Sequence, residues 1–97
     1  MNRELYAESN SAIIMRLGKR FADYRKRMRL TQKEISEHTG LSIFTISAFE
    51  SGSSTGITVA SLLKLLRAIE SLEEIEKLLP ELPVSAKELF MQNKTKQ

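Results

Sequence analysis

Apolar residues recur every three or four positions along most of this chain, and that spacing predicts amphipathic helices rather than strands. We predict an all-α fold with helices over residues 11–28, 31–39, 42–51, 58–69 and 71–79. Thr58 is expected to cap the fourth helix, and Ser71 with Glu74 to form a capping box for the fifth. The first helix carries the longest apolar stripe, which we expect to be buried: Ile13, Ile14, Leu17, Phe21, Tyr24 and Met28.

The second and third helices are separated by a corner of three residues. Thr31 is a good N-cap, and Glu34 three positions later completes a capping box. Gly40 can turn the chain because glycine adopts a left-handed backbone at little cost. Ser42 can cap the next helix, and Ile46 and Phe49 of that helix then pack back on the helix that begins at Thr31. Two short helices around such a corner are typical of a helix-turn-helix, in which the second helix can enter the DNA major groove.

Several spaced residues of this stretch carry a resemblance to a known family. They are Gln32, Ile35, Gly40, Leu41, Ile46, Phe49 and Glu50. In these positions the chain resembles the Xre/phage-repressor (Cro/C1-type) helix-turn-helix family, and the similarity extends from Arg25 to about Leu79. It implies a five-helix, lambda-repressor-like domain that binds DNA. The run Thr45 to Glu50 is most similar to HipB-type antitoxins, which bind a HipA-like kinase toxin.

The chain divides into one domain and two flanking segments. We expect residues 1–10 to be an N-terminal arm or a frayed first turn, and residues 11–79 to be the domain, with its helix-turn-helix at 31–51. Residues 80–97 are expected to be a partly disordered extension, because Pro80 ends the fifth helix and Pro83 prevents its restart. Ser85 and Glu88 could cap a last short helix in that extension, ending in Leu89, Phe90 and Met91.

Positive charge is concentrated in the first predicted helix. The net charge of the 97 residues is +3, but residues 16–29 hold seven basic side chains and a single acid, Asp23. Such a cluster beside a helix-turn-helix favours contact with DNA phosphates, and a solvated helix face without a partner is the alternative. With no cysteine, a lone His38 and no paired carboxylates or phosphate loop, we expect no enzyme, no cofactor and no metal site. A cytoplasmic, nucleoid-associated location in a prokaryote or phage is the default expectation.

The family resemblance, together with the basic charge beside the motif, assigns DNA-contacting roles to individual residues. Base edges would be met by Ser42, Ile43, Phe44, Ser47 and Ala48. The DNA backbone would be met by Arg16, Lys19, Arg20, Gln32, Lys33, Thr45, Ser53 and Ser54, with Thr55 a further candidate in the same loop. The resemblance also implies an ion pair between Arg25 and Glu50 that ties the first predicted helix to the third.

The predicted reading helix departs from the family in having no Arg, Lys or Gln at its outward positions. It therefore lacks the bidentate contacts that distinguish guanine and adenine most sharply. We predict a preference for T·A-containing steps, read through thymine methyl groups, with a contribution from DNA shape. The competing interpretation is that Ile43 and Phe44 form an apolar patch for a protein partner.

The family and the small size of the domain both favour a homodimer. The residues expected at its interface are Leu72, Ile75, Leu79 and Phe90, and the alternative is that these side chains only complete the core. The leading hypothesis is a dimeric repressor of its own promoter that binds an inverted repeat with half-sites about 34 Å apart, and that could also be the antitoxin of a HipA-like kinase. The alternative is a protein-interaction module with a degenerate helix-turn-helix.

Overall fold

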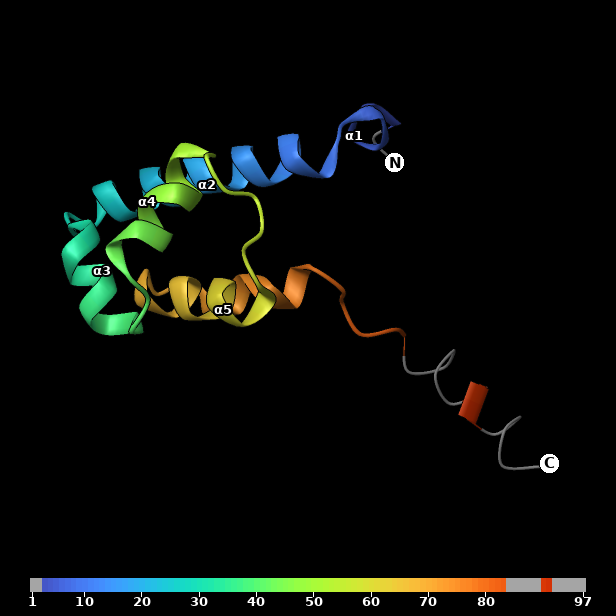
Figure 1. Cartoon of the computed structure of the whole chain (residues 1–97). Helices are drawn as coiled ribbons and strands as arrows, with labels where there is room; N and C mark the ends of the chain where they lie inside the picture. The colour runs from blue at the N-terminus through green and yellow to red at the C-terminus, as the bar shows by residue number, and fades with distance from the viewer. Residues whose placement is uncertain (1–2, 84–89, 92–97) are drawn as a thin grey trace.

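Helices make up the fold, and turns and short loops connect them (Figure 1). The computed structural model describes residues 3–83 and 90–91. Within residues 3–83 the elements are α1 (Arg3–Ala7), α2 (Asn10–Arg27), α3 (Gln32–Thr39), α4 (Ile43–Ser51), α5 (Val59–Ala68) and a 3-10 helix, η1 (Leu72–Lys77). The described part of the chain contains no strand, and the predicted all-α fold is confirmed. None of these helices is both long and apolar enough to cross a membrane.

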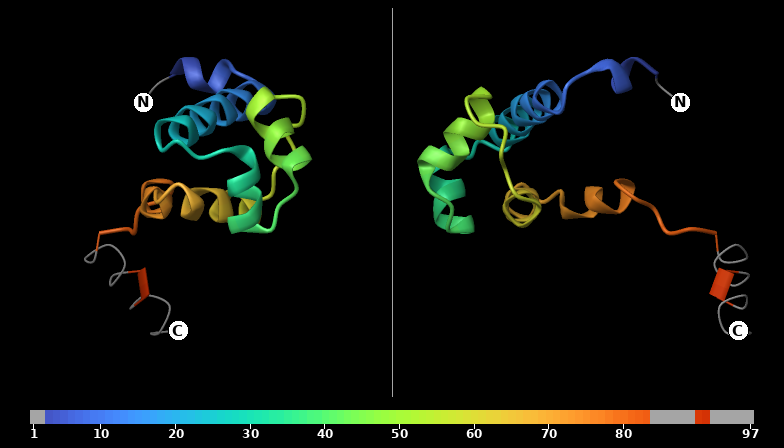
Figure 2. Two further views of the ribbon diagram at one scale, coloured as in Figure 1. Left: turned by 90° about the vertical axis from the view of Figure 1, so that its left-hand side faces the viewer. Right: turned by 45° about the vertical axis from the view of Figure 1, so that its right-hand side comes forward.

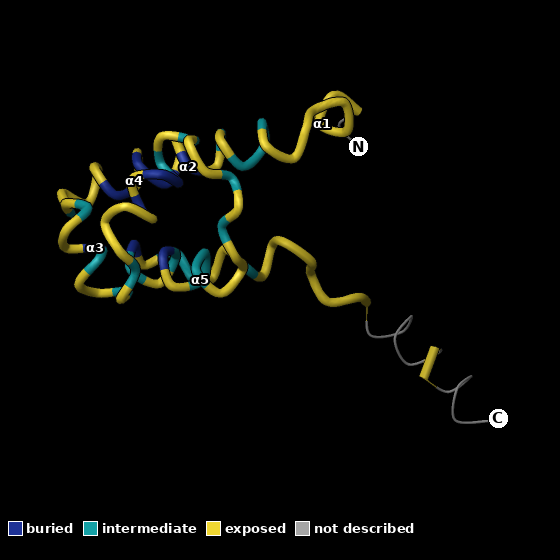
Figure 3. The backbone as a smooth tube through the Cα atoms, in the orientation of Figure 1, coloured by how far each residue is buried: buried dark blue, intermediate teal, exposed yellow. Residues whose placement is uncertain are grey.

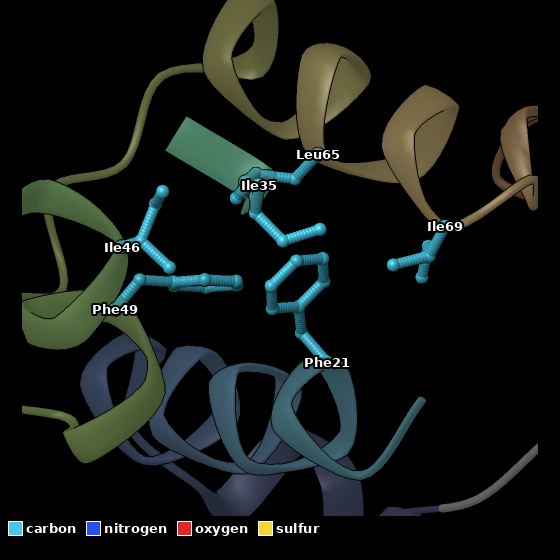
Figure 4. Packing of buried hydrophobic residues seen from close by; sticks show 6 residues of the cluster. All are labelled: Phe21, Ile35, Ile46, Phe49, Leu65 and Ile69. Atoms are coloured by element: carbon cyan, nitrogen blue, oxygen red, sulfur yellow. The ribbon is translucent and has the colours of Figure 1, made fainter. Parts of the chain in front are cut away.

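The core lies where four helices meet, and each contributes at least one side chain (Figure 4). It consists of Phe21 from α2, Ile35 from α3, Ile46 and Phe49 from α4, Leu65 from α5 and Ile69 at the end of α5. The rings of Phe21 and Phe49 lie 5.9 Å apart between centroids and are tilted by 46°. In Figure 4, α2 and α5 lie on opposite sides of this cluster, with α4 beside it.

The buried face of α2 differs from the predicted stripe. Gly18, Phe21, Ala22 and Arg25 are its buried residues. Three members of the predicted stripe are instead exposed: Leu17 (37%), Tyr24 (52%) and Met28 (38%). The helix is turned so that Gly18 faces α4, and large apolar residues at the side of the stripe reach solvent.

Gly18 explains this orientation of α2. A Cβ atom added there would overlap the carbonyl oxygen of Phe49 and lie 2.9 Å from its carbonyl carbon. The backbones of α2 and α4 therefore cross at a distance that only glycine permits.

The two ends of the chain also depart from the predictions. The expected N-terminal arm contains α1, and the Ser9 side chain caps α2 by accepting from the Ala12 N–H at 3.1 Å. The expected α-helix over 71–79 is the shorter η1, without a capping bond from Ser71. Its hydroxyl instead donates backwards to the Ile69 carbonyl oxygen at 3.3 Å.

The chain after η1 leads away from the helices (Figure 2) and is exposed along its described length to residue 83 (Figure 3). The last short helix predicted from Ser85 and the disorder expected from Asn93 to Gln97 lie outside the described residues, apart from Phe90 and Met91, which are helical and exposed.

Candidate nucleic-acid interface

The corner between α3 and α4 has the predicted local geometry. The Thr31 hydroxyl accepts from the Glu34 N–H at 3.0 Å, and the Glu34 carboxylate accepts from the Thr31 N–H at 2.9 Å, which completes the capping box. Gly40 ends α3 in the left-handed conformation with φ of 78°. Ser42 caps α4 by accepting from the Thr45 N–H at 3.1 Å. Each of these signals depends on a few neighbouring residues, and all are confirmed.

Two hydroxyls on α3 hold the corner from inside, and the sequence did not single them out for this role. The Ser36 hydroxyl donates to the Leu41 carbonyl oxygen at 2.6 Å. The Thr39 hydroxyl donates to the Ile35 carbonyl oxygen at 2.8 Å and accepts from the Leu41 N–H at 3.1 Å. These bonds satisfy backbone groups that the corner takes out of the helices. They fix the direction in which α4 leaves α3.

Arg25 and Glu50 form the expected ion pair between α2 and α4. The Arg25 Nε lies 2.6 Å and its second terminal nitrogen 2.8 Å from the two Glu50 carboxylate oxygens. Only 10% and 7% of the two side chains are exposed. Hydrogen bonding to Glu50 raises the pKa of Arg25.

The same network reaches α3. The Gln32 side-chain amide donates to Glu50 at 3.0 Å, and Arg25 also donates to the Leu30 carbonyl oxygen at 2.9 Å. One carboxylate thus ties α2, α3 and α4 together. As a result, the N-terminus of α3 and the outer face of α4 are held in a fixed relation.

The outer face of α4 carries most of the predicted base-reading residues. Ser42, Ile43, Phe44 and Ser47 are exposed, Phe44 to 81% and Ile43 to 46%. Thr45, predicted as a DNA-backbone contact, is exposed beside them, and its hydroxyl lies 2.9 Å from that of Ser42.

The prediction that Ala48 contacts bases is corrected by its burial, because the residue is only 7% exposed. Helical spacing puts Ala48 on the side of Phe44, but the chain after α4 turns back over it. The Ser54 N–H donates to the Ala48 carbonyl oxygen at 3.2 Å, and Ile57 lies with Ala48 in the lining of one hollow. Little of Ala48 is therefore left for a base edge to contact.

Backbone amides of the loop after α4 already donate hydrogen bonds within the protein. The Ser53 N–H donates to the Ser51 hydroxyl at 3.3 Å, and the Ser54 N–H donates to Ala48. The Thr55 hydroxyl lies 3.3 Å from that of Ser11 at the start of α2. The side chains of Ser53 and Ser54 are exposed, so a phosphate would meet their hydroxyls rather than their amides.

The basic residues predicted to contact DNA are placed in three different ways. Lys19 is exposed on α2, next to Gly18 at the α4 crossing, and Lys33 is exposed in the first turn of α3. Arg16 is paired with Glu8 through two bonds of 2.7 and 2.6 Å, and these bonds lower the pKa of Glu8. Arg20 is exposed and lines a groove that is formed with residues of α4 and α5, among them Phe49 and Leu66.

Of the four residues predicted at a dimer interface, only Leu72 and Ile75 lie in the same element. Leu72 and Ile75 are half-buried in η1, which packs on α5. Leu79 is 87% exposed in the segment that leads away from the helices, where Leu78 and Leu82 are exposed as well. Phe90 is 58% exposed.

The comparisons with known proteins agree with this geometry. Residues 18–94, well over half of the chain, match a protein family described as helix-turn-helix domain. Searches of curated proteins and of solved structures found no match. The matched range contains the α3–α4 corner, the Arg25–Glu50 pair and the exposed face of α4. The chain belongs to the helix-turn-helix domain family of DNA-binding regulators.

Proposed function

We propose that this protein is a sequence-specific transcriptional repressor that binds DNA as a homodimer. The observation that carries the proposal is the network of Glu50 with Arg25 and Gln32, which holds the α3 N-terminus beside the exposed face of α4. An α-helix N-terminus favours phosphate, and an exposed second helix of this motif fits the major groove. Both surfaces can then meet one duplex at the same time.

The contacts divide by the chemistry of the residues. Lys19, Lys33 and the N-terminus of α3 supply the positive charge and donors that phosphates require. Ser42, Ile43, Phe44 and Ser47 face the bases. Arg16 and Arg20 on α2 have weaker support, because Arg16 is already paired with Glu8 and Arg20 lines a groove with residues of α5.

The proposed homodimer is supported by the apolar side chains that the single chain leaves exposed after η1. Leu78, Leu79 and Leu82 are 68%, 87% and 70% exposed. Three large apolar residues within five positions are the kind of surface that marks an interface. A two-fold dimer would place its two α4 helices about 34 Å apart, so the operator would be an inverted repeat with half-sites about 10 base pairs apart.

The finer assignment rests on the resemblance of the Thr45–Glu50 run. We place the protein among Xre-type repressors that regulate their own promoter in the cytoplasm, and within them with HipB-like antitoxins. A gene for a HipA-like kinase beside this one, and co-purification of the two products, would support the antitoxin role. A restriction-modification or prophage neighbourhood would favour a controller or phage-type repressor instead.

The first test is binding to the DNA just upstream of the coding sequence, measured by fluorescence anisotropy at two salt concentrations with a random duplex as control. We expect tighter binding to the upstream fragment. The variants Lys19→Gln and Lys33→Gln should weaken binding to both duplexes alike, and each should reduce the dependence of log K on log salt by about one.

The matched control for these variants is Lys64→Gln, on α5 across the core from α2 (Figure 4). It removes the same charge and should leave binding unchanged. Equal, weak binding of the unmodified protein to both duplexes would reject the repressor. It would favour the second candidate, a protein-interaction module, for which the 81% exposure of Phe44 is the supporting observation.

A further inference from the structure

The outer surface of α4 and its following loop is almost free of the groups that proteins use to read polar base edges. Residues 42–56 contain no Lys, Arg, His, Asn or Gln, and their single charged residue is Glu50. The Glu50 carboxylate is 7% exposed and accepts from Arg25 and Gln32. It therefore has little capacity to accept from cytosine. Only hydroxyls and apolar side chains remain for contact with DNA bases.

Most of the hydroxyls on this surface already take part in hydrogen bonds within the protein. Ser42 caps α4 and lies 2.9 Å from the Thr45 hydroxyl. Ser51 donates to the Ala48 carbonyl oxygen at 3.4 Å. Ser47 brings an exposed hydroxyl to the same face. A serine hydroxyl can donate or accept and so bonds to any base, which gives little discrimination.

The apolar part of the surface is large and well placed. Phe44 and Ile43 are 81% and 46% exposed in the first turn of α4, the part of a reading helix that approaches bases most closely. Ser47 lies three positions from one and four from the other, so the three side chains share a face. The Phe44 ring also forms part of the wall of a shallow hollow of about 290 Å³.

In the major groove the one apolar group on a standard base edge is the C5-methyl of thymine. Pressing a phenyl ring on a polar edge instead would remove water from donors and acceptors without replacing their bonds. Adding a methyl at C5 of cytosine puts the same apolar group at the same place on the other pyrimidine. An apolar reader should therefore respond to the methyl group and much less to the pyrimidine that carries it.

We propose that Ile43 and Phe44 read the C5-methyl group of pyrimidines, so that the protein accepts 5-methylcytosine as well as thymine at the positions α4 contacts. This inference rests on the proposed function, since it requires that α4 enters the major groove. It adds a modified base to the ligands of this surface and assigns selectivity to two apolar side chains.

The test starts from a duplex selected by the full-length protein from a randomised library. Each thymine of that duplex is replaced in turn by uracil, which only deletes the methyl. The same positions are then compared as C·G and as 5-methyl-C·G pairs. Binding is measured by fluorescence anisotropy. We expect uracil to weaken binding about four-fold per contacted methyl, equivalent to about 0.8 kcal/mol, and 5-methylcytosine to bind about four-fold better than cytosine.

Variants show whether α4 is responsible for the response. Phe44→Ser and Ile43→Ser should each reduce the response to methyl groups, and the double variant should abolish it. Their substituted side chains are exposed, so we expect the fold to persist, which circular dichroism checks. Phe44→Leu keeps an apolar side chain and should keep a partial response. Tyr24→Ser removes an exposed ring on α2 that lines a groove with residues of α5, and it should leave the methyl response unchanged.

The outcomes separate this inference from the proposed function. If no selected duplex binds better than random DNA, both are wrong. If a selected duplex binds tightly but uracil and 5-methylcytosine change nothing, the repressor stands and the methyl reading is wrong. A methyl response that survives the double Ile43→Ser, Phe44→Ser variant would also overturn it, because other residues would then be reading the methyl group.

Discussion

The ion pair between Arg25 and Glu50 should make one of the largest single contributions to the stability of this fold. Replacing Arg25 by Met leaves the Glu50 carboxylate in a site where its side chain is only 7% exposed, with the Gln32 amide as its remaining bond in the network. Removing one partner of a buried pair costs roughly 3–5 kcal/mol, because the other charge is left without compensation. A domain of this size has about 5–15 kcal/mol in total. We therefore expect Tm to fall by at least about 12 °C.

A double-mutant cycle measures how much of this cost comes from the stranded charge. The set is Arg25→Met, Glu50→Leu and the combined variant, unfolded in urea and followed by far-UV circular dichroism. The combined variant removes both charges, but it still leaves the Gln32 amide and the Leu30 carbonyl without their partners, at about 1–3 kcal/mol. The combined variant should lose less unfolding free energy than the two single variants lose together, and the coupling free energy should be about 3 kcal/mol.

Arg16 supplies the matched control for the cycle. It also forms a two-bond pair with a carboxylate, Glu8, but 41% and 35% of the two side chains are exposed. Solvated pairs contribute little, so Arg16→Met should lower stability far less than Arg25→Met does. The reasoning is refuted if Arg25→Met costs no more than Arg16→Met, or if the two single effects in the cycle simply add.

Two further predictions test the helix crossing and the cap. Gly18→Ala should destabilise the protein by about 2 kcal/mol in urea unfolding, because overpacking against the Phe49 backbone costs about 3 kcal/mol and the higher helix propensity of alanine restores about 1 kcal/mol. The control is Gly56→Ala, where a Cβ meets nothing within 4 Å, and it should change stability by less than about 1 kcal/mol. Equal losses of stability in the two variants would disprove the close crossing of α2 and α4. Hydrogen bonds from the backbone and hydroxyl of Thr31 hold the pKa of Glu34 below its ordinary 4.5. The ionised Glu34 carboxylate therefore stabilises the fold above pH 4.5, and this contribution is lost as the pH falls through the lower pKa of Glu34 in the folded protein. A carboxyl resonance of Glu34 that titrates at 4.5 or higher in an NMR titration would contradict the cap.

Local signals in the sequence predicted the motif well, because each depends on residues within one turn. Thr31 with Glu34, Gly40 and Ser42 all adopt the predicted geometry. The cap of α5 by Thr58 is also confirmed, with the Ser61 N–H donating at 3.0 Å. Such caps are chosen by short-range hydrogen bonds, and tertiary packing has little to change in them.

The same reasoning failed at Ser71 and Glu74, which have the capping-box spacing of Thr31 and Glu34. The backbone of Ser71 has φ of −127° and ψ of 26°, whereas Thr31 has the extended ψ of 161° that a cap needs. Its hydroxyl turns back to Ile69, and a 3-10 helix follows. The end of α5 decides the conformation at Ser71, and the spacing alone carries no information about it.

The face of α2 could not be predicted because its apolar residues cover a broad arc. The pattern favoured the large side chains Leu17 and Tyr24, but the helix buries Gly18 and Ala22, and Gly18 lies against α4. Close crossing of two helices rewards small residues, and hydrophobicity patterns give those residues little weight. Ala48 is hidden for a related reason, since the loop that follows α4 turns back over it.

In the proposed complex these features separate affinity from selectivity. The cations that attract DNA are on α2 and α3, and α4 with its loop brings no cation to the surface at all. Electrostatic attraction acts on every duplex alike, so it cannot choose a sequence. The choice then depends on how closely Ile43 and Phe44 approach the bases, and that distance is set by the bonds from Arg25 and Gln32 to Glu50. A buried carboxylate that touches no base would thus control how well a helix without cations reads the sequence.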